Sequence, residues 1–143
     1  VKSLINHIKI LKKQYNEFSF CIIPSRRTNK SILNLLIQEL SEIAFVWEKQ
    51  TVNPYLFSLK FSKFFIVTSD SSSMISECAN TGKPIYVYHL PFKRVSNRIS
   101  NFHKEFEEKN ITRKLSDSLD IWEYSKLNEA KRIAGILRLR ILK

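Results

Sequence analysis

The sequence predicts an α/β protein built on a parallel sheet, and three observations support this prediction. Short apolar runs alternate with longer segments in which apolar residues recur every three or four positions. The runs are apolar on both faces, which is typical of parallel strands covered by helices on each side. Stretches rich in proline, serine and asparagine separate the two kinds of segment. This alternation indicates a Rossmann-like three-layer sandwich.

Five strands and six helices are expected in order. The strands are the runs FSFCII, AFVW, FFIVT, PIYVY and, in a shorter form, NITR. The first two helices are marked by apolar residues on one side, namely Leu4, Ile5, Ile8 and Leu11, then Ile32, Leu35, Leu36 and Leu40. The segment NPYLFSLKFS predicts a short helix with Pro54 in its first turn. Further helices are expected after the third strand and near residues 99–109.

The last helix shows the most regular stripe. Its apolar residues recur at gaps of three and four, namely Leu127, Ala130, Ala134, Leu137 and Ile141. Such a stripe predicts a helix that faces the core.

The expected topology is one sheet of about five strands in the order 2-1-3-4-5, within a single Rossmann-like nucleotide-binding domain over residues 1–143. Strands 1 and 3 are then neighbours at a topological switch point, where open α/β sheets bind ligands at the carboxyl ends of the strands. Two polar loops, residues 25–28 and 69–73, follow these two strands. We therefore expect them to face each other across one crevice.

Composition favours anionic partners without choosing among them. The formal net charge is +11 and the isoelectric point is about 9.8, which suits nucleotides, nucleic acid or an anionic membrane surface. Cys21 and Cys78 have apolar neighbours and no metal-binding spacing, so we expect reduced core residues of a cytoplasmic protein. The chain starts at Val1 just before a helix, and we expect a piece of a two-domain protein.

The loop SDSSS after the third strand is the first candidate site. Serine and aspartate favour helix N-termini, where one residue suffices as a cap. The same N-terminus attracts anions through its N–H groups and dipole. Glu77 lies three positions after Met74, which cannot cap, so a capping box does not explain it. Ser73, Glu77 and Asn80 fall on one side of the expected helix, and Ile75 and Cys78 on the other. Capping and phosphate binding both remain open for this loop, and the candidate binding residues are Ser69, Asp70, Ser71, Ser73, Met74 and Glu77.

Two further loops are basic. PSRRT offers Arg26 and Arg27, whose guanidinium groups can grip phosphate, beside the hydroxyls of Ser25 and Thr28. The alternative is a solvated turn capped by Thr28 or Asn29. HLPFKRVSNR is either a solvated loop or a loop that closes over a ligand, with His89, Lys93 and Arg94 as its candidates.

Glycine usage argues against standard nucleotide motifs. The chain has only Gly82 and Gly135, so it carries neither a G-x-G-x-x-G fingerprint nor a Walker A loop. Any phosphate must be held by Arg, Ser, Thr and helix N-termini. His7, His89 and His103 are scattered, and we expect no metal site and a packed or surface position for His103.

Several motifs together resemble a known family. PSRRT, NPY, VTSDSSSMISECANTGKPIYVY, NFHKEFEEKNITR and WEY resemble, in this order, the carboxyl half of the Elm-type mitochondrial fission proteins, which have plant and alphaproteobacterial members. The resemblance implies the second domain of a GT-B glycosyltransferase-like fold, which usually binds the nucleotide-sugar donor. A nucleotide-sugar epimerase would need the glycine fingerprint that this chain lacks.

The resemblance also implies roles. Glu77 matches a glutamate that binds the donor ribose, Ser71 and Ser73 match a diphosphate cradle, and Arg26 and Arg27 match a donor-side basic loop. A catalytic base would come from the amino-terminal domain, and no cofactor is implied beyond a nucleoside diphosphate or nucleotide-sugar.

Three functions follow from these observations. The first is a nucleotide-sugar-binding half of a metal-independent glycosyltransferase-like protein. The second is a non-catalytic scaffold peripheral to an anionic membrane, which basic residues would contact, namely Lys131, Arg132, Arg138, Arg140 and Lys143. Nucleic-acid binding ranks last, because no aromatic-basic stacking motif is visible.

Overall fold

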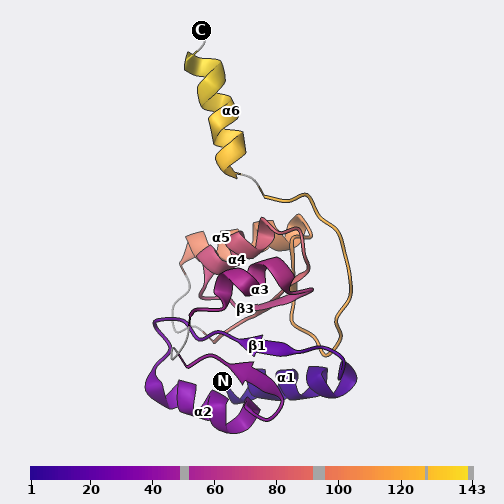
Figure 1. Cartoon of the computed structure of the whole chain (residues 1–143). Coiled ribbons are helices and arrows are strands. Elements are labelled where there is room, and N and C mark those ends of the chain that lie inside the picture. Colours follow the sequence, from indigo (N-terminus) through magenta and orange to yellow (C-terminus); the bar gives the residue numbers. More distant parts are fainter. Residues whose placement is uncertain (49–51, 92–95, 128, 142–143) are drawn as a thin grey trace. The chain divides into compact units, whose positions relative to one another are not determined.

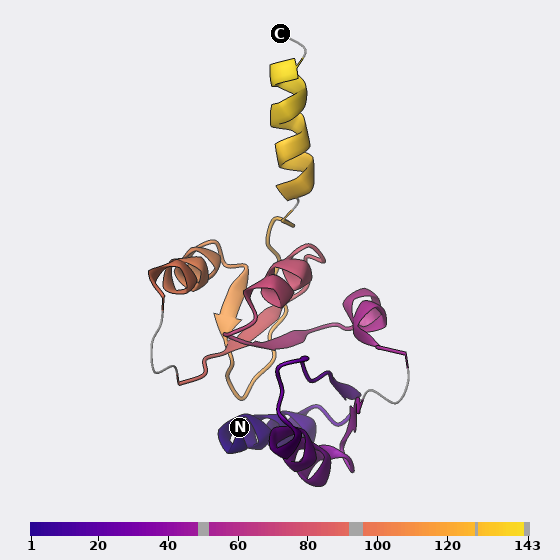
Figure 2. The same ribbon diagram turned by 90° about the vertical axis from the view of Figure 1, so that its left-hand side faces the viewer.

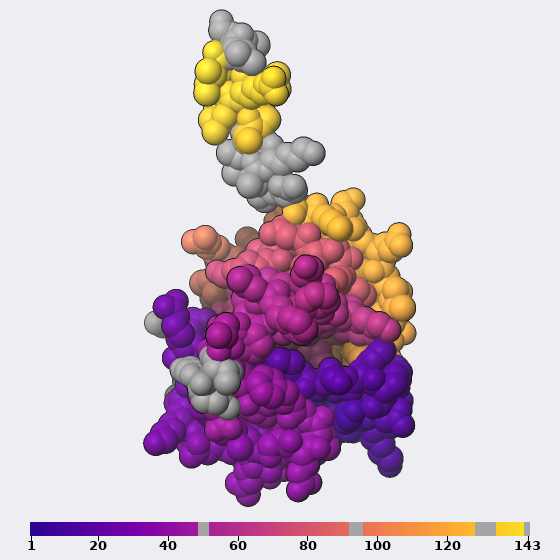
Figure 3. Space-filling view, in the orientation of Figure 1, coloured from indigo at the N-terminus to yellow at the C-terminus, as the bar shows by residue number. Residues whose placement is uncertain are grey.

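The chain forms an α/β protein, as predicted, and each of the five expected strands is present. A computed structural model describes residues 1–48, 52–91, 96–127 and 129–141, whose ribbon and surface are drawn in Figures 1 and 3. The elements are α1 (Lys2–Gln14), β1 (Phe20–Ile22), α2 (Lys30–Leu40), β2 (Ala44–Val46), α3 (Tyr55–Phe61), β3 (Phe65–Thr68), α4 (Ser72–Ala79), β4 (Ile85–Tyr88), α5 (Asn97–Glu108), β5 (Thr112–Lys114) and α6 (Glu129–Ile141).

The strands form two parallel sheets, and the expectation of one five-stranded sheet is wrong. β1 pairs with β2, and β3, β4 and β5 pair in that order. Each sheet joins strands that are neighbours along the chain and are separated by one helix. Pairing such strands closes only a short loop of chain, which costs little conformational entropy. β1 has only three residues and offers a short ladder. Pairing β1 with β3 would also require closing a loop that contains two helices and a strand.

The chain divides into two compact units, which are described separately. Unit 1 comprises residues 1–62 and 115–120, and unit 2 comprises residues 63–114 and 121–143.

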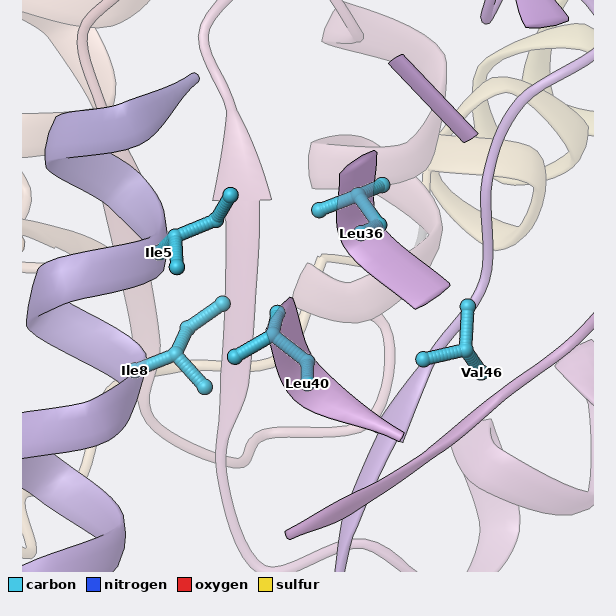
Figure 4. Packing of buried hydrophobic residues seen from close by; sticks show 5 residues of the cluster. All are labelled: Ile5, Ile8, Leu36, Leu40 and Val46. Atoms are coloured by element: carbon cyan, nitrogen blue, oxygen red, sulfur yellow. The ribbon is translucent and has the colours of Figure 1, made fainter. Parts of the chain in front are cut away.

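The core of unit 1 lies between its first two helices and its sheet. Ile5 and Ile8 of α1 meet Leu36 and Leu40 of α2, and Val46 of β2 completes the cluster (Figure 4). The spacing of three and four residues brings these side chains to one face of each helix. The periodicity that predicted these helices therefore also identified the core of unit 1.

The other face of the unit 1 sheet is open. Cys21 and Phe45 are register partners, and both are exposed, Phe45 to 52%. Successive side chains of a strand point to opposite faces, so these two lie on the face away from the core cluster. The expectation that Cys21 is a core residue is therefore wrong. An apolar run alone does not show whether both faces of a strand are covered.

Unit 2 is built around β4, the central strand of its sheet. Ile85, Tyr86 and Val87 are almost completely buried. α4 and α5 lie on the same face of this sheet (Figures 1 and 2), as two successive right-handed crossovers require. Ile75, Cys78 and Ala79 form the buried side of α4, so the expected core position of Cys78 is confirmed.

Residues 121–127, which follow a segment of unit 1, are held in unit 2 by ring packing and hydrogen bonds. Trp122 packs edge-on against Tyr86 at 5.1 Å between ring centroids, and its indole N–H donates to the carbonyl of Asn110 at 2.9 Å. The hydroxyl of Tyr124 donates to the carbonyl of Lys83 at 2.7 Å. Burial raises the pKa of Tyr124 to about 12, so this hydroxyl remains a donor at physiological pH.

The apolar stripe of the last helix does not face a core. Leu137 is 51% exposed and Ile141 is 78% exposed, and Ala134 is exposed as well. The helix itself is present as α6. The expected core-facing position is wrong for these described side chains, because helical periodicity predicts an apolar face but not the surface that covers it.

Candidate functional site

Ser69, the first residue after β3, anchors the loop that carries the candidate site. Its N–H donates to the carbonyl of Tyr88 at 3.0 Å, and its hydroxyl accepts the N–H of Leu90 at 3.0 Å. Its carbonyl accepts a hydrogen bond from Nε2 of His103 at 2.8 Å. Ser69 is fully buried. The structure therefore places Ser69 as a residue that fixes the loop, with its own polar groups already engaged.

The start of α4 lacks a side-chain cap. Ser71 occupies the N-cap position but makes no side-chain capping hydrogen bond. Within the described part of the chain, the hydroxyls of Ser71, Ser72 and Ser73 have no hydrogen-bond partner. These three hydroxyls therefore do not cap the helix. These hydroxyls lie beside the N–H groups of the first turn, which have no partner within the helix itself.

The sides of α4 divide as the sequence predicted. Ser73, Glu77 and Asn80 are exposed, while Ile75 and Cys78 are buried against unit 2. Residues spaced by three and four positions share one face of a helix. The exposed stripe therefore begins at the uncapped N-terminus and continues through Glu77. Asp70 and Met74, the other predicted residues of this loop, are both half-buried.

The PSRRT segment of unit 1 forms a tight turn. The Thr28 N–H donates to the Ser25 carbonyl at 3.1 Å, the Ser25 hydroxyl accepts the Arg27 N–H at 3.1 Å, and the two hydroxyls lie 3.4 Å apart. Asn29 caps α2, because its side chain accepts the N–H of Ile32 at 2.8 Å.

Of the two predicted cap residues, Thr28 and Asn29, it is therefore Asn29 that caps the helix after this turn. The side chains of Arg26 and Arg27 are exposed. They lie in unit 1 and the serine loop lies in unit 2, so their meeting at one ligand stays a prediction.

His89, the first residue after β4, has a carboxylate partner. Its Nε2 lies 3.3 Å from Oε1 of Glu107 in α5, and both side chains are partly exposed. Its ring packs edge-on against the ring of His103 at 5.3 Å between centroids. His103 is buried, which is the packed one of the two positions that the sequence left open. Lys93 and Arg94, the other candidates of the closing loop, lie outside the described residues.

Glu107 was not predicted from the sequence, although a signal for it exists. It lies four positions after His103 on α5, so the two share one face of that helix. His89 follows β4, the strand that pairs with β3 in register Thr68–Tyr88. A histidine at a strand end together with a His-x-x-x-Glu pattern on the next helix would have indicated the contact.

Neither a metal-binding cluster nor a membrane-spanning helix is found among the described residues. In the ranges that the structure covers, no group of three or more His, Cys, Asp or Glu side chains could hold a metal ion. No helix among them is long and apolar enough to cross a membrane.

The chain matches known sequences over nearly its whole length. A sequence model of the family described as Mitochondrial fission ELM1 matches residues 1–141. The chain is 32% identical over 125 residues to the mitochondrial fission protein ELM1 of Arabidopsis thaliana, which is 82% of this chain and 28% of the relative.

A bacterial relative is similar to the same degree. The chain is 32% identical over 142 residues to the uncharacterized protein RP120 of Rickettsia prowazekii, which is 92% of this chain and 40% of the relative. The chain therefore spans well under half the length of either relative. No solved structure matches.

Proposed function

The chain belongs to the mitochondrial fission ELM1 family, and we propose that unit 2 binds the diphosphate of a nucleoside diphosphate or nucleotide-sugar at the start of α4. One observation supports this most directly. α4 begins at the end of β3 without a side-chain cap, beside serine hydroxyls that have no partner among the described residues. The N–H groups of a first helical turn and the positive end of the helix dipole favour a phosphate at this position.

The neighbouring groups suit the other parts of such a ligand. The exposed carboxylate of Glu77 lies one turn beyond Ser73 on the same side of α4, where it can accept hydrogen bonds from ribose hydroxyls. The net charge of +11 favours an anionic ligand in general.

The chemistry that fits this set of donors is glycosyl transfer. Backbone N–H groups, hydroxyls and guanidinium groups can stabilise a departing diphosphate directly. The catalytic base and the acceptor site would come from other parts of a longer protein. The relatives are at least twice as long as the segments that match this chain.

Nucleotide titrations followed by NMR test this proposal. We expect uridine and guanosine diphosphates and their sugars to shift the amides of residues 71–77, with one base preferred. Ser73→Asp places a carboxylate where the phosphate would bind, so it should lower the affinity at least about tenfold. An acidic residue in the first turn also favours the helix, so this variant should remain folded.

Ser100→Asp is the matched control, because it makes the same change near the start of α5 at an exposed position of the same unit. We expect it to bind nucleotide as the unchanged protein does. Equal binding by the Ser73→Asp variant, or no amide shift with any of the nucleotides at millimolar concentration, would contradict the proposal.

α6 supports a second candidate function, a scaffold peripheral to an anionic membrane. Leu137 and Ile141 share one face of the helix and are exposed, and Arg138 and Arg140 lie on either side of that face. No acidic residue follows Glu129. Basic amphipathic helices of this kind lie in membrane interfaces, with apolar residues inserted and basic residues near anionic headgroups.

Vesicle sedimentation tests this candidate. We expect the chain to sediment with vesicles containing phosphatidylglycerol and not with phosphatidylcholine alone. Replacing Arg138 and Arg140 by Glu should reduce binding by about a hundredfold, from about 1 kcal/mol for each basic residue lost and the repulsion added. Replacing Lys104 of α5 and Lys109, its C-cap residue, by Glu makes the same charge change elsewhere. Equal losses from both double variants would indicate net charge alone.

A further inference from the structure

His89 lies at the same edge of the sheet as the serine loop. Thr68 and Tyr88 are register partners at the ends of the parallel strands β3 and β4. Ser69 and His89 are the next residues, so both leave the sheet at its carboxyl edge. Hydrogen bonds from Ser69 to Tyr88 and from Leu90 to Ser69 tie the two loops together. The histidine is therefore held beside the loop that leads into α4.

Two residues of α5 fix the His89 ring. Glu107 faces its Nε2 at 3.3 Å, and the ring of His103 packs edge-on against it. His103 is fixed in turn, because a carbonyl oxygen only accepts, so its Nε2–H must donate to Ser69 at 2.8 Å. His89 remains 39% exposed. A ring that is oriented by a carboxylate and still open to solvent is typical of functional histidines.

We propose that His89, oriented by Glu107, contacts the diphosphate held at the start of α4, and the inference rests on the function proposed above. Because Nε2 is the ring nitrogen that lies beside the Glu107 carboxylate, Nδ1 is the nitrogen left for a ligand. In the charged ring Nδ1 carries a hydrogen and donates to a phosphate oxygen. In the neutral ring the same atom has a lone pair and cannot donate to it. Glu107 is a positioning residue in this arrangement, and His103 and Glu107 are the titratable groups that face His89.

The test uses inorganic pyrophosphate, which carries the diphosphate without a base or sugar. Its affinity for the unchanged chain and for the His89→Gln variant is measured by calorimetry from pH 5.5 to pH 8. Pyrophosphate titrates in this range too, but its own titration affects both proteins equally and cancels in their ratio. At pH 5.5 we expect the unchanged chain to bind pyrophosphate about tenfold more tightly than the His89→Gln variant, because the variant lacks the charge-assisted hydrogen bond. At pH 8 we expect the two proteins to bind it equally, because a neutral imidazole does not make that bond.

His7→Gln is the matched control. His7 also faces a carboxylate, with Nδ1 2.7 Å from Oδ1 of Asp117, but it lies in unit 1. This variant should keep the affinity and the pH profile of the unchanged chain. Glu107→Gln should retain binding at pH 8 and lose part of the gain at low pH, which a general loss of structure would not produce.

The two proposals can fail separately. If pyrophosphate shifts the amide of Ser73 but the His89→Gln variant shows the same pH profile as the unchanged chain, the role of His89 is overturned and the site at α4 stands. If pyrophosphate shifts no amide in residues 69–77 at any pH, both proposals are overturned.

Discussion

The two sheets of this chain are built from similar strands but have different surroundings. In unit 2, β4 has a strand on each side, and Ile85 and Val87 are almost completely buried. In unit 1, β1 and β2 form a two-stranded ladder, and Cys21 and Phe45 are exposed on one face. The candidate site lies on the more fully buried sheet. A site gains precision when rigid elements hold its side chains, and unit 2 provides them.

The difference also extends to polar groups. Ser69 uses its N–H, hydroxyl and carbonyl to join the two strand ends and α5. The PSRRT turn of unit 1 bonds mainly within itself, through Ser25, Thr28 and Asn29. The loop of unit 2 is thus positioned by distant segments, whereas that of unit 1 is a local turn. This contrast favours the serine loop as the fixed part of a binding site.

The two cysteines give the largest contrast between the units. Cys78 in α4 is only 2% exposed, and burial raises its pKa to about 12, whereas Cys21 in β1 is exposed. The thiolate is the reactive form, and at pH 8 a group with that pKa is about one part in ten thousand thiolate. We expect a disulfide reagent to modify Cys21 rapidly and Cys78 at least about a thousandfold more slowly in the folded protein.

Single Cys21→Ser and Cys78→Ser variants identify the thiol that reacts. In strong denaturant both cysteines should react at similar rates, because the difference depends on burial. Comparable rates for the two cysteines in the folded protein would show that α4 opens readily from its sheet. The comparison between a closed unit 2 and an open unit 1 would then fail.

Much of this fold follows from local pattern. Spacing identified α1 and α2 and their core residues, and the apolar runs identified the strands. The exposed stripe that runs from Ser73 through Glu77 was predicted from helical periodicity and is present. These features depend on residues close in sequence, so the sequence alone determines them.

The features that were mispredicted or missed depend on distant segments. Whether Cys21 is covered depends on what packs on β1, and its apolar neighbours in sequence do not reveal that. The stripe on α6 was predicted to face a core, yet Leu137 is exposed. The contact between His89 and Glu107 joins a strand end to a helix eighteen positions later. Such contacts depend on the tertiary fold. Helical periodicity predicts which face of a helix is apolar, but not which other segment packs against that face.

A matched pair of isoleucines sharpens the comparison at the level of packing, with a smaller effect. Ile85 in β4 is completely buried, whereas Ile22 in β1 is half-buried. Ile85→Ala should lower the free energy of unfolding by about 2–5 kcal/mol, through lost burial and the cavity left behind. Ile22→Ala makes the same chemical change in a parallel strand and should cost about half as much, because part of its side chain already contacts water. Urea unfolding followed by circular dichroism measures both. Equal costs would mean that the core face of β1 is as well covered as β4 in solution, and the contrast between the two sheets would then rest on Cys21 and Phe45 alone.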